Sequence, residues 1–199
     1  MTMNKWIASG LIATGLLAGC AQSDAAPAKP VEVAGNRVAV VYFSWSPSGN
    51  TRFAAQTIAA KAGAKLFEIK PERPYSTDFR TCCEEAKPEF SGKRMRPIRA
   101  IPGLDLAQYD VIFIGTPNWF GTMAPPVWTF VAQNAAALKG KTVCIFVTHG
   151  SGGMQRVGKE FAGLVPDSNV LPAQAFPGST IRDNVAALEK FVTDRIKEK

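Results

Sequence analysis

Short apolar runs alternate with amphipathic segments along most of the chain. Residues 37–43, 110–115 and 142–147 are apolar almost throughout, which is the pattern of strands in a parallel sheet covered on both faces. Residues 65–70 form a shorter run, and residues 169–176 a weaker one. The sequence therefore predicts five strands, in these places along the chain.

Segments with helical spacing of apolar residues separate these runs. In residues 51–62 five apolar side chains fall on one helix face, as expected for a helix packed on a sheet. Further helices are predicted over residues 78–86, 127–138, 155–164 and 182–197. Strands that alternate with helices in this way select an α/β fold with a doubly wound parallel sheet.

The helix over residues 78–86 has predicted limits at both ends. Ser76 or Thr77 can cap its first turn,. Pro88 disfavours helical backbone at the residue before it, so the helix is expected to end at Lys87,.

The beginning of the chain has the pattern of a targeting segment. Residues 1–19 are apolar apart from a short polar start with Lys5, which predicts a signal peptide,. Residues 17–20, Leu-Ala-Gly-Cys, resemble the lipobox of bacterial lipoproteins, and this resemblance implies cleavage before Cys20 and a lipid anchor on Cys20. Ala21, in place of Asp, favours the outer membrane facing the periplasm if the source is Gram-negative. A plain signal peptide with an incidental cysteine is the alternative.

Residues 20–35 are small, contain prolines and lack an apolar period. They are predicted to form a flexible tether. Residues 36–199 then form one domain of ordinary size with room for a core.

The turn after the first strand, residues 44–51 with the sequence SWSPSGNT, is the first candidate site. Hydroxyl and amide side chains followed by a helix N-terminus suit an anion. No lysine is present, which argues against a Walker loop, and the spacing is not that of a dinucleotide-binding glycine motif. A monophosphate is the better fit, and an ordinary capped turn is the alternative.

Two later loops lie in corresponding places. Residues 116–126, TPNWFGTMAPP, follow the third predicted strand, and residues 148–153, THGSGG, follow the fourth. Together with the first loop, these two segments resemble the binding loops of the flavodoxin family in their order along the chain and in their spacing. That resemblance implies a five-stranded sheet of order 2-1-3-4-5 and FMN as cofactor, with its phosphate at the first loop and its ring between the other two. The cofactor-binding residues it implies are Ser44, Ser46, Ser48, Gly49, Asn50, Thr51, Thr116, Pro117, Asn118, Trp119, Phe120, Gly121, Thr148, His149, Gly150 and Gly152.

His149 is the only histidine of the chain. It is a candidate proton donor to reduced flavin, and a loop histidine bonded to backbone is the alternative. Cys82 and Cys83 are adjacent, without the spacing of a redox-active pair,, and no cluster of metal ligands is evident.

Charge narrows the choice of partner. Without its signal peptide the chain has 22 Lys and Arg against 16 Asp and Glu, and no basic run dense enough to indicate nucleic acid. None of the three loops contains an acidic residue. The absence of acidic residues favours exchange of two electrons with a quinone or a nicotinamide. We therefore expect an FMN-dependent oxidoreductase, and an electron carrier that binds a redox protein is the alternative. A cofactor-free binding module of the same fold is the third possibility.

Overall fold

The computed structural model describes residues 30–33, 37–91 and 95–198. The predicted signal peptide, Cys20 and most of the tether lie outside the described residues. Among the residues described, no helix has the length and apolar character needed to cross a membrane.

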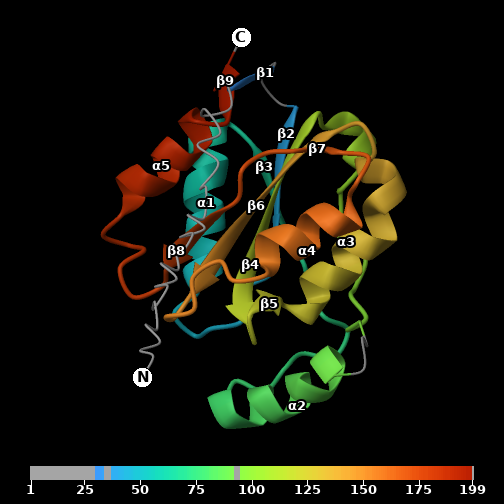
Figure 1. Ribbon diagram of the computed structural model, residues 1–199, viewed down its shortest axis with the longest axis vertical. Coiled ribbons are helices and arrows are strands. Elements are labelled where there is room, and N and C mark those ends of the chain that lie inside the picture. The colour runs from blue at the N-terminus through green and yellow to red at the C-terminus, as the bar shows by residue number, and fades with distance from the viewer. Residues whose placement is uncertain (1–29, 34–36, 92–94, 199) are drawn as a thin grey trace, which may run out of the picture.

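A parallel sheet forms the centre of the molecule (Figure 1). Its strands are β2 (Val38–Tyr42), β3 (Lys65–Glu68), β4 (Val111–Trp119), β6 (Thr142–His149) and β7 (Asn169–Val170), in the order β3-β2-β4-β6-β7. This is the order 2-1-3-4-5 in the numbering of the five predicted strands, so the α/β doubly wound fold is confirmed. The first and third predicted strands are neighbours, with Tyr42 opposite Gly115.

Helices cover both faces of the sheet (Figure 1). On one face, α1 (Asn50–Ala62) and α5 (Val185–Thr193) pack on Val40, Phe113 and Phe146. On the other, α3 (Pro125–Leu138) and α4 (Val157–Leu164) join a core that contains Ile112, Ile114 and Ile145. Successive strand residues alternate between the two cores, which explains why these strands are apolar throughout.

The helix α2 (Phe79–Ser91) differs from its prediction, because it contains Pro88 and does not end at Lys87. Asp78 is the residue that caps it, accepting a hydrogen bond from the backbone N–H of Thr81 at 2.9 Å. The turn after Pro88 is held by tertiary contacts: Glu89 pairs with Arg96 at 3.2 Å, and the ring of Phe90 lies 4.9 Å from that of Phe120. These contacts compensate for the backbone hydrogen bond that a proline cannot donate.

Three other predictions change in detail. The fifth strand is two short pieces, β7 and β8 (Gln174–Pro177), both paired with β6. The predicted closing helix ends at Thr193, and its last residues form β9 (Ile196–Glu198), which pairs with β1 (Val31–Val33). The predicted tether includes residues 31–33, yet these residues form a strand and Val33 is buried. A 3-10 turn, Leu106–Gln108, precedes β4.

Candidate functional site

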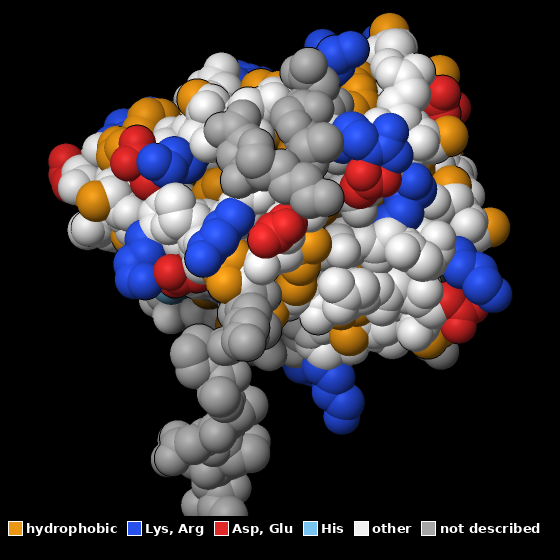
Figure 2. Space-filling model, turned by 90° about the horizontal axis from the view of Figure 1, so that it is seen from above, with side chains coloured by type: hydrophobic (Ala, Val, Ile, Leu, Met, Phe, Trp, Pro, Cys, Tyr) orange, Lys and Arg blue, Asp and Glu red, His pale blue; other side chains and the backbone are white. Residues whose placement is uncertain are grey.

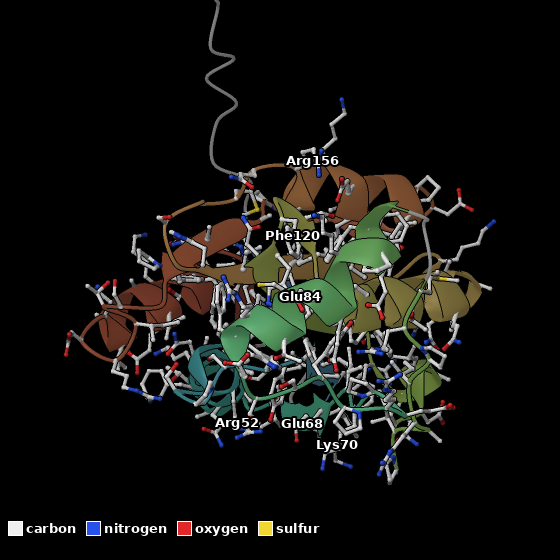
Figure 3. The ribbon with its side chains drawn as sticks, turned by 90° about the horizontal axis from the view of Figure 1, so that it is seen from below. Arg52, Glu68, Lys70, Glu84, Phe120 and Arg156 are labelled. Atoms are coloured by element: carbon white, nitrogen blue, oxygen red, sulfur yellow. The ribbon has the colours of Figure 1, made fainter. Side chains whose placement is uncertain are left out.

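The three polar loops meet at the carboxyl ends of β2, β4 and β6. Tyr42 pairs with Gly115, and Pro117 with Thr148, so the loops that follow these residues leave the sheet side by side. The strand order reverses between β2 and β4, and ligands of such sheets bind outside the carboxyl ends at this point. Seen toward this edge, α2 crosses in front of the loops, with Glu84 on it and Phe120 close behind (Figure 3).

The first loop places an uncapped helix end at this edge. Gly49 is the N-cap of α1, with φ of 62°, in the left-handed region that glycine tolerates best,. Among the described residues no side chain forms a cap hydrogen bond with α1, and the first turn of this helix has no acidic residue. The backbone N–H of Asn50 reaches only to 3.5 Å from the Ser46 hydroxyl, which lies 3.1 Å from that of Ser48. The N-cap Gly49 has no side chain to offer, and the long bond to Ser46 leaves the N–H groups of the first turn with capacity to bind an anion,.

Thr51 is bonded to the third loop. Its hydroxyl lies 2.7 Å from that of Thr148, and the two residues are 2% and 4% exposed. The Thr51 side chain therefore ties the first loop to the end of β6, and Ser46 and Ser48 are the more accessible hydroxyls of the loop.

The second loop contains a hairpin, whereas the sequence predicts a loop over all of residues 116–126. β4 continues to Trp119 and turns back through Phe120 and Gly121 into β5 (Thr122–Met123). Both turn residues have positive φ, 51° and 83°, as a two-residue hairpin of this type requires. A left-handed conformation is unusual for a residue as bulky as Phe120, and its side chain is 53% exposed.

Asn118 fixes the hairpin relative to the third loop. Its side-chain N–H donates to Gly153 O at 2.7 Å, and its side-chain oxygen accepts from Gly121 N at 3.0 Å. Thr116, buried within β4 before the hairpin, accepts from Ala124 N at 3.0 Å and so supports the hairpin.

His149 ends β6 in the third loop. Its backbone carbonyl accepts from Gly178 N at 2.8 Å. Its ring atom Nδ1 is buried without a hydrogen-bond partner among the described residues, and the same holds for the hydroxyl of Ser44. A buried polar atom that no described residue satisfies is unusual,. The predicted alternative, a histidine side chain bonded to backbone, is not seen at Nδ1.

Aromatic rings surround Trp119. The rings of Phe43, Trp45 and Tyr75 lie 5.7, 5.8 and 5.0 Å from its ring, all edge to face. The indole N–H of Trp45 donates to Ser76 O at 2.8 Å, which joins this cluster to the segment before α2.

An ion pair cluster under α2 holds the helix over the site. The Arg96 guanidinium lies 3.7 Å from the Tyr75 ring centroid and pairs with Glu89. Tyr75 donates to Glu89 at 2.5 Å, and burial with this hydrogen bond raises the pKa of the Tyr75 hydroxyl. Glu85 accepts from Ser76 N at 3.0 Å. These contacts connect α2 to Tyr75, and through its ring to Trp119.

Sequence reasoning missed several residues of this edge. Gln155 lies between the second and third loops, since a Cβ on Gly121 would come within 2.4 Å of its side-chain oxygen. Arg156 N donates to Gly121 O at 3.1 Å, and Thr122 donates to Glu160. Arg182, far along the chain, donates to Ser48 O in the first loop. Single polar residues outside a recognisable motif gave no signal for these contacts.

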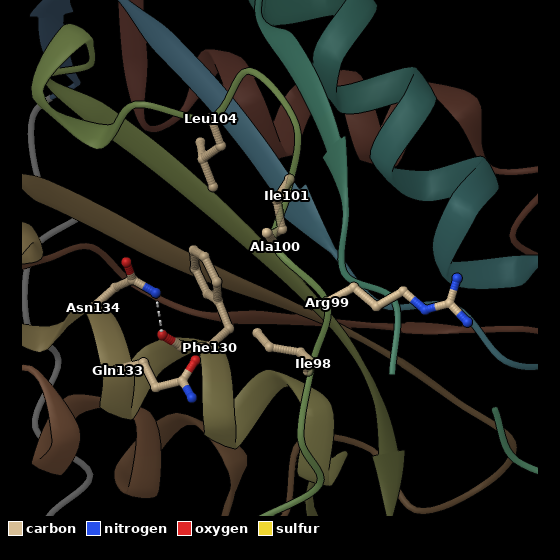
Figure 4. Close-up of a pocket in the computed structure, with 8 residues that line it drawn as sticks. All are labelled: Ile98, Arg99, Ala100, Ile101, Leu104, Phe130, Gln133 and Asn134. Carbon is tan, nitrogen blue, oxygen red and sulfur yellow. Dashed lines mark hydrogen bonds between the residues drawn. The ribbon is translucent and has the colours of Figure 1, made fainter. Parts of the chain in front are cut away.

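A separate cavity of about 220 Å³ lies between residues 98–104 and α3 (Figure 4). It is lined by Phe130, Arg99, four aliphatic side chains and the amides of Gln133 and Asn134, and by none of the three loops. Within the described ranges, no group of three or more His, Cys, Asp and Glu side chains is placed to hold a metal ion. The opposite edge of the sheet, where the strands begin, has basic and acidic side chains interspersed (Figure 2).

A family model described as flavodoxin matches residues 37–192. The chain belongs to the flavodoxin family. Known structures of similar fold include a proposed flavoprotein of Bacteroides uniformis, 27% identical with a TM-score of 0.65, covering 79% of this chain and 98% of that one. A flavoprotein of Lactobacillus acidophilus, crystallised in complex with FMN, is 25% identical with a TM-score of 0.61, over 76% of this chain and 99% of its own. The flavodoxin of Megasphaera elsdenii, at 19% identity and a TM-score of 0.50, shares the fold.

Proposed function

We propose that this chain binds FMN noncovalently at the three loops and transfers electrons through it. The observation that carries the proposal is the convergence of an uncapped α1 N-terminus with two buried, unpartnered polar atoms, Ser44 Oγ and His149 Nδ1, at one edge of the sheet. A bound ligand would satisfy groups that the protein leaves unsatisfied. The FMN complex of the Lactobacillus acidophilus relative supports the choice of ligand.

The residues present fit FMN. The phosphate is a dianion, which the first-turn N–H groups of α1 and the hydroxyls of Ser46 and Ser48 would hold. The flavin ring needs flat apolar contacts and backbone donors, and the hairpin with Trp119 and Phe120 and the third loop would supply both. When bound, FMN supplies redox chemistry with one or two electrons. His149 would hold a proton at Nδ1 or accept a bond there.

Charge supports an oxidoreductase over a carrier. None of the three loops contains an acidic residue, and the chain is basic. A positive surrounding stabilises the extra negative charge of a reduced flavin, so that transfer of two electrons to a quinone or a nicotinamide is favoured. A carrier that exchanges single electrons with a redox protein is the alternative, and steady-state turnover with a soluble quinone and NADH or NADPH distinguishes the two.

The direct test is to isolate the chain, denature it and identify any released flavin by absorbance and chromatography. FMN released in near-equal amount to protein is expected. A colourless protein that takes up no added FMN would leave a cofactor-free binding module as the better explanation.

We also propose that the chain is anchored in the cell envelope through a lipid on Cys20. The support is the sequence of residues 1–20 alone, a signal peptide that ends in Leu-Ala-Gly-Cys,. Incorporation of labelled palmitate by the wild-type chain and its loss in Cys20→Ala test it. Equal labelling of both chains, or none of either, would contradict the anchor.

A further inference from the structure

The segment between β8 and α5 packs on the first loop. Gly178 N donates to His149 O at 2.8 Å, and a Cβ on Gly178 would come within 2.4 Å of the Asn50 side-chain nitrogen. Gly178 therefore lies against the start of α1 and the end of β6, and a larger side chain at this position would require the Asn50 side chain to move.

Arg182 reaches from this segment to the rim of the first loop. Its guanidinium carbon lies 4.7 Å from the ring centroid of Phe53, in the first turn of α1, and its Nη2 donates to Ser48 O. A ring contact and a hydrogen bond together fix the planar group in one place. The carbonyl oxygen that it holds belongs to one of the two serines with accessible hydroxyls in the loop.

Among the described residues, no carboxylate forms an ion pair with Arg182. Arg52, which lies beside Phe53 in the first turn of α1, does pair with a carboxylate, that of Glu68 at 2.8 Å. A guanidinium carries five N–H groups and stays protonated at every pH of interest, so donors and a full positive charge remain beside the loop after the bond to Ser48.

We infer that Arg182 is a specificity-determining residue for the phosphate of the flavin. It adds a fixed positive charge to a loop whose own donors are neutral, and it thereby favours FMN over riboflavin, which lacks the phosphate. The inference rests on the proposed function. The stack on Phe53 and the bond to Ser48 hold the charge at the loop rim before the ligand arrives, so little side-chain ordering is needed on binding.

The test compares flavin affinities of four full-length chains purified in detergent and freed of bound flavin: wild type, Arg182→Gln, Arg182→Lys and Lys159→Gln. Lys159 is exposed on α4, across the sheet from α1, and its substitution makes the same change in net charge. Quenching of flavin fluorescence gives the dissociation constants of FMN and riboflavin at low and high ionic strength. Thermal melting of each flavin-free chain checks that the fold is intact.

Arg182→Gln is expected to weaken FMN binding about three- to tenfold, with the larger effect at low ionic strength. Riboflavin affinity should not change, Arg182→Lys should recover part of the loss, and Lys159→Gln should match wild type. Equal affinity of wild type and Arg182→Gln for FMN, or an equal loss for FMN and riboflavin, would overturn the inference and leave the proposed function standing. A wild-type chain that binds neither flavin would overturn both.

Discussion

The hydroxyl oxygen of Thr51 lies 2.7 Å from that of Thr148, although 97 residues separate them in the chain. Thr51 is the last residue of the first loop and lies in the first turn of α1, and Thr148 lies at the end of β6, beside His149. The bond joins two of the three site loops in the interior of the protein. The position of the first loop is thus coupled to that of the third.

Thr148→Val should destabilise the fold by about 1 to 3 kcal/mol, because it leaves the buried Thr51 hydroxyl without its partner. The double variant Thr51→Val/Thr148→Val should lose less than the two single losses added together. Urea unfolding of the three variants measures this. Thr142→Val is the control on the same strand, where the hydroxyl accepts from an exposed Asn169 side chain at 3.2 Å. Strictly additive losses would mean that the Thr51–Thr148 bond contributes nothing.

Phe120→Gly should weaken FMN binding while leaving stability within about 1 kcal/mol of wild type. Glycine removes the strain of a positive φ, which costs roughly 1 kcal/mol or more, and this offsets the lost contact with the Phe90 ring, worth about 0.5 to 1.5 kcal/mol. FMN titration and urea unfolding measure the two effects. Leu66→Ala, a partly exposed apolar residue on the edge strand β3, is the control. A large loss of stability with unchanged FMN affinity would make Phe120 a packing residue only.

The sheet and its three loops could be predicted because the central strands are buried on both faces and each loop has a recognisable sequence motif. The elements that sequence reasoning missed depend on distant partners. β1 and β9 are three residues each, too short for a pattern, and form because they pair with one another. The helix α2 continues beyond Pro88 because Glu89 pairs with Arg96 and the Phe90 ring packs against that of Phe120.

The positions of site residues could be predicted only where the register of the strands determines them. Thr148 and His149 occupy the end of β6, Thr116 lies in the later part of β4, and the register of these two strands brings all three to one edge. The left-handed backbone of Phe120 and the reach of Arg182 to Ser48 follow from turns and packing that no local pattern specifies.

Cys82 should resist alkylation in the native protein at pH 8. It is 3% exposed, and burial raises the pKa of its thiol to about 12. At pH 8 that leaves about one thiolate in 10,000, and the thiolate is the reactive form. Peptide mass spectrometry after brief treatment with iodoacetamide should find Cys83, which is only half-buried, labelled first. Cys83→Ser should remove this labelling, and Cys82→Ser should not. Labelling of Cys82 as fast as Cys83 would contradict the burial and revive a redox role for the pair.

The central claim, FMN bound through its phosphate at the first loop, is tested most directly by the ratio of FMN and riboflavin affinities of the wild-type chain. Charge-assisted bonds to a phosphate contribute about 1.5 to 3 kcal/mol each, so FMN should bind at least tenfold more tightly than riboflavin. The measurement is a fluorescence titration of the flavin-free protein with each ligand. FMN bound with a clear advantage over riboflavin is the predicted result, and equal affinities, or no binding of FMN, would contradict the account.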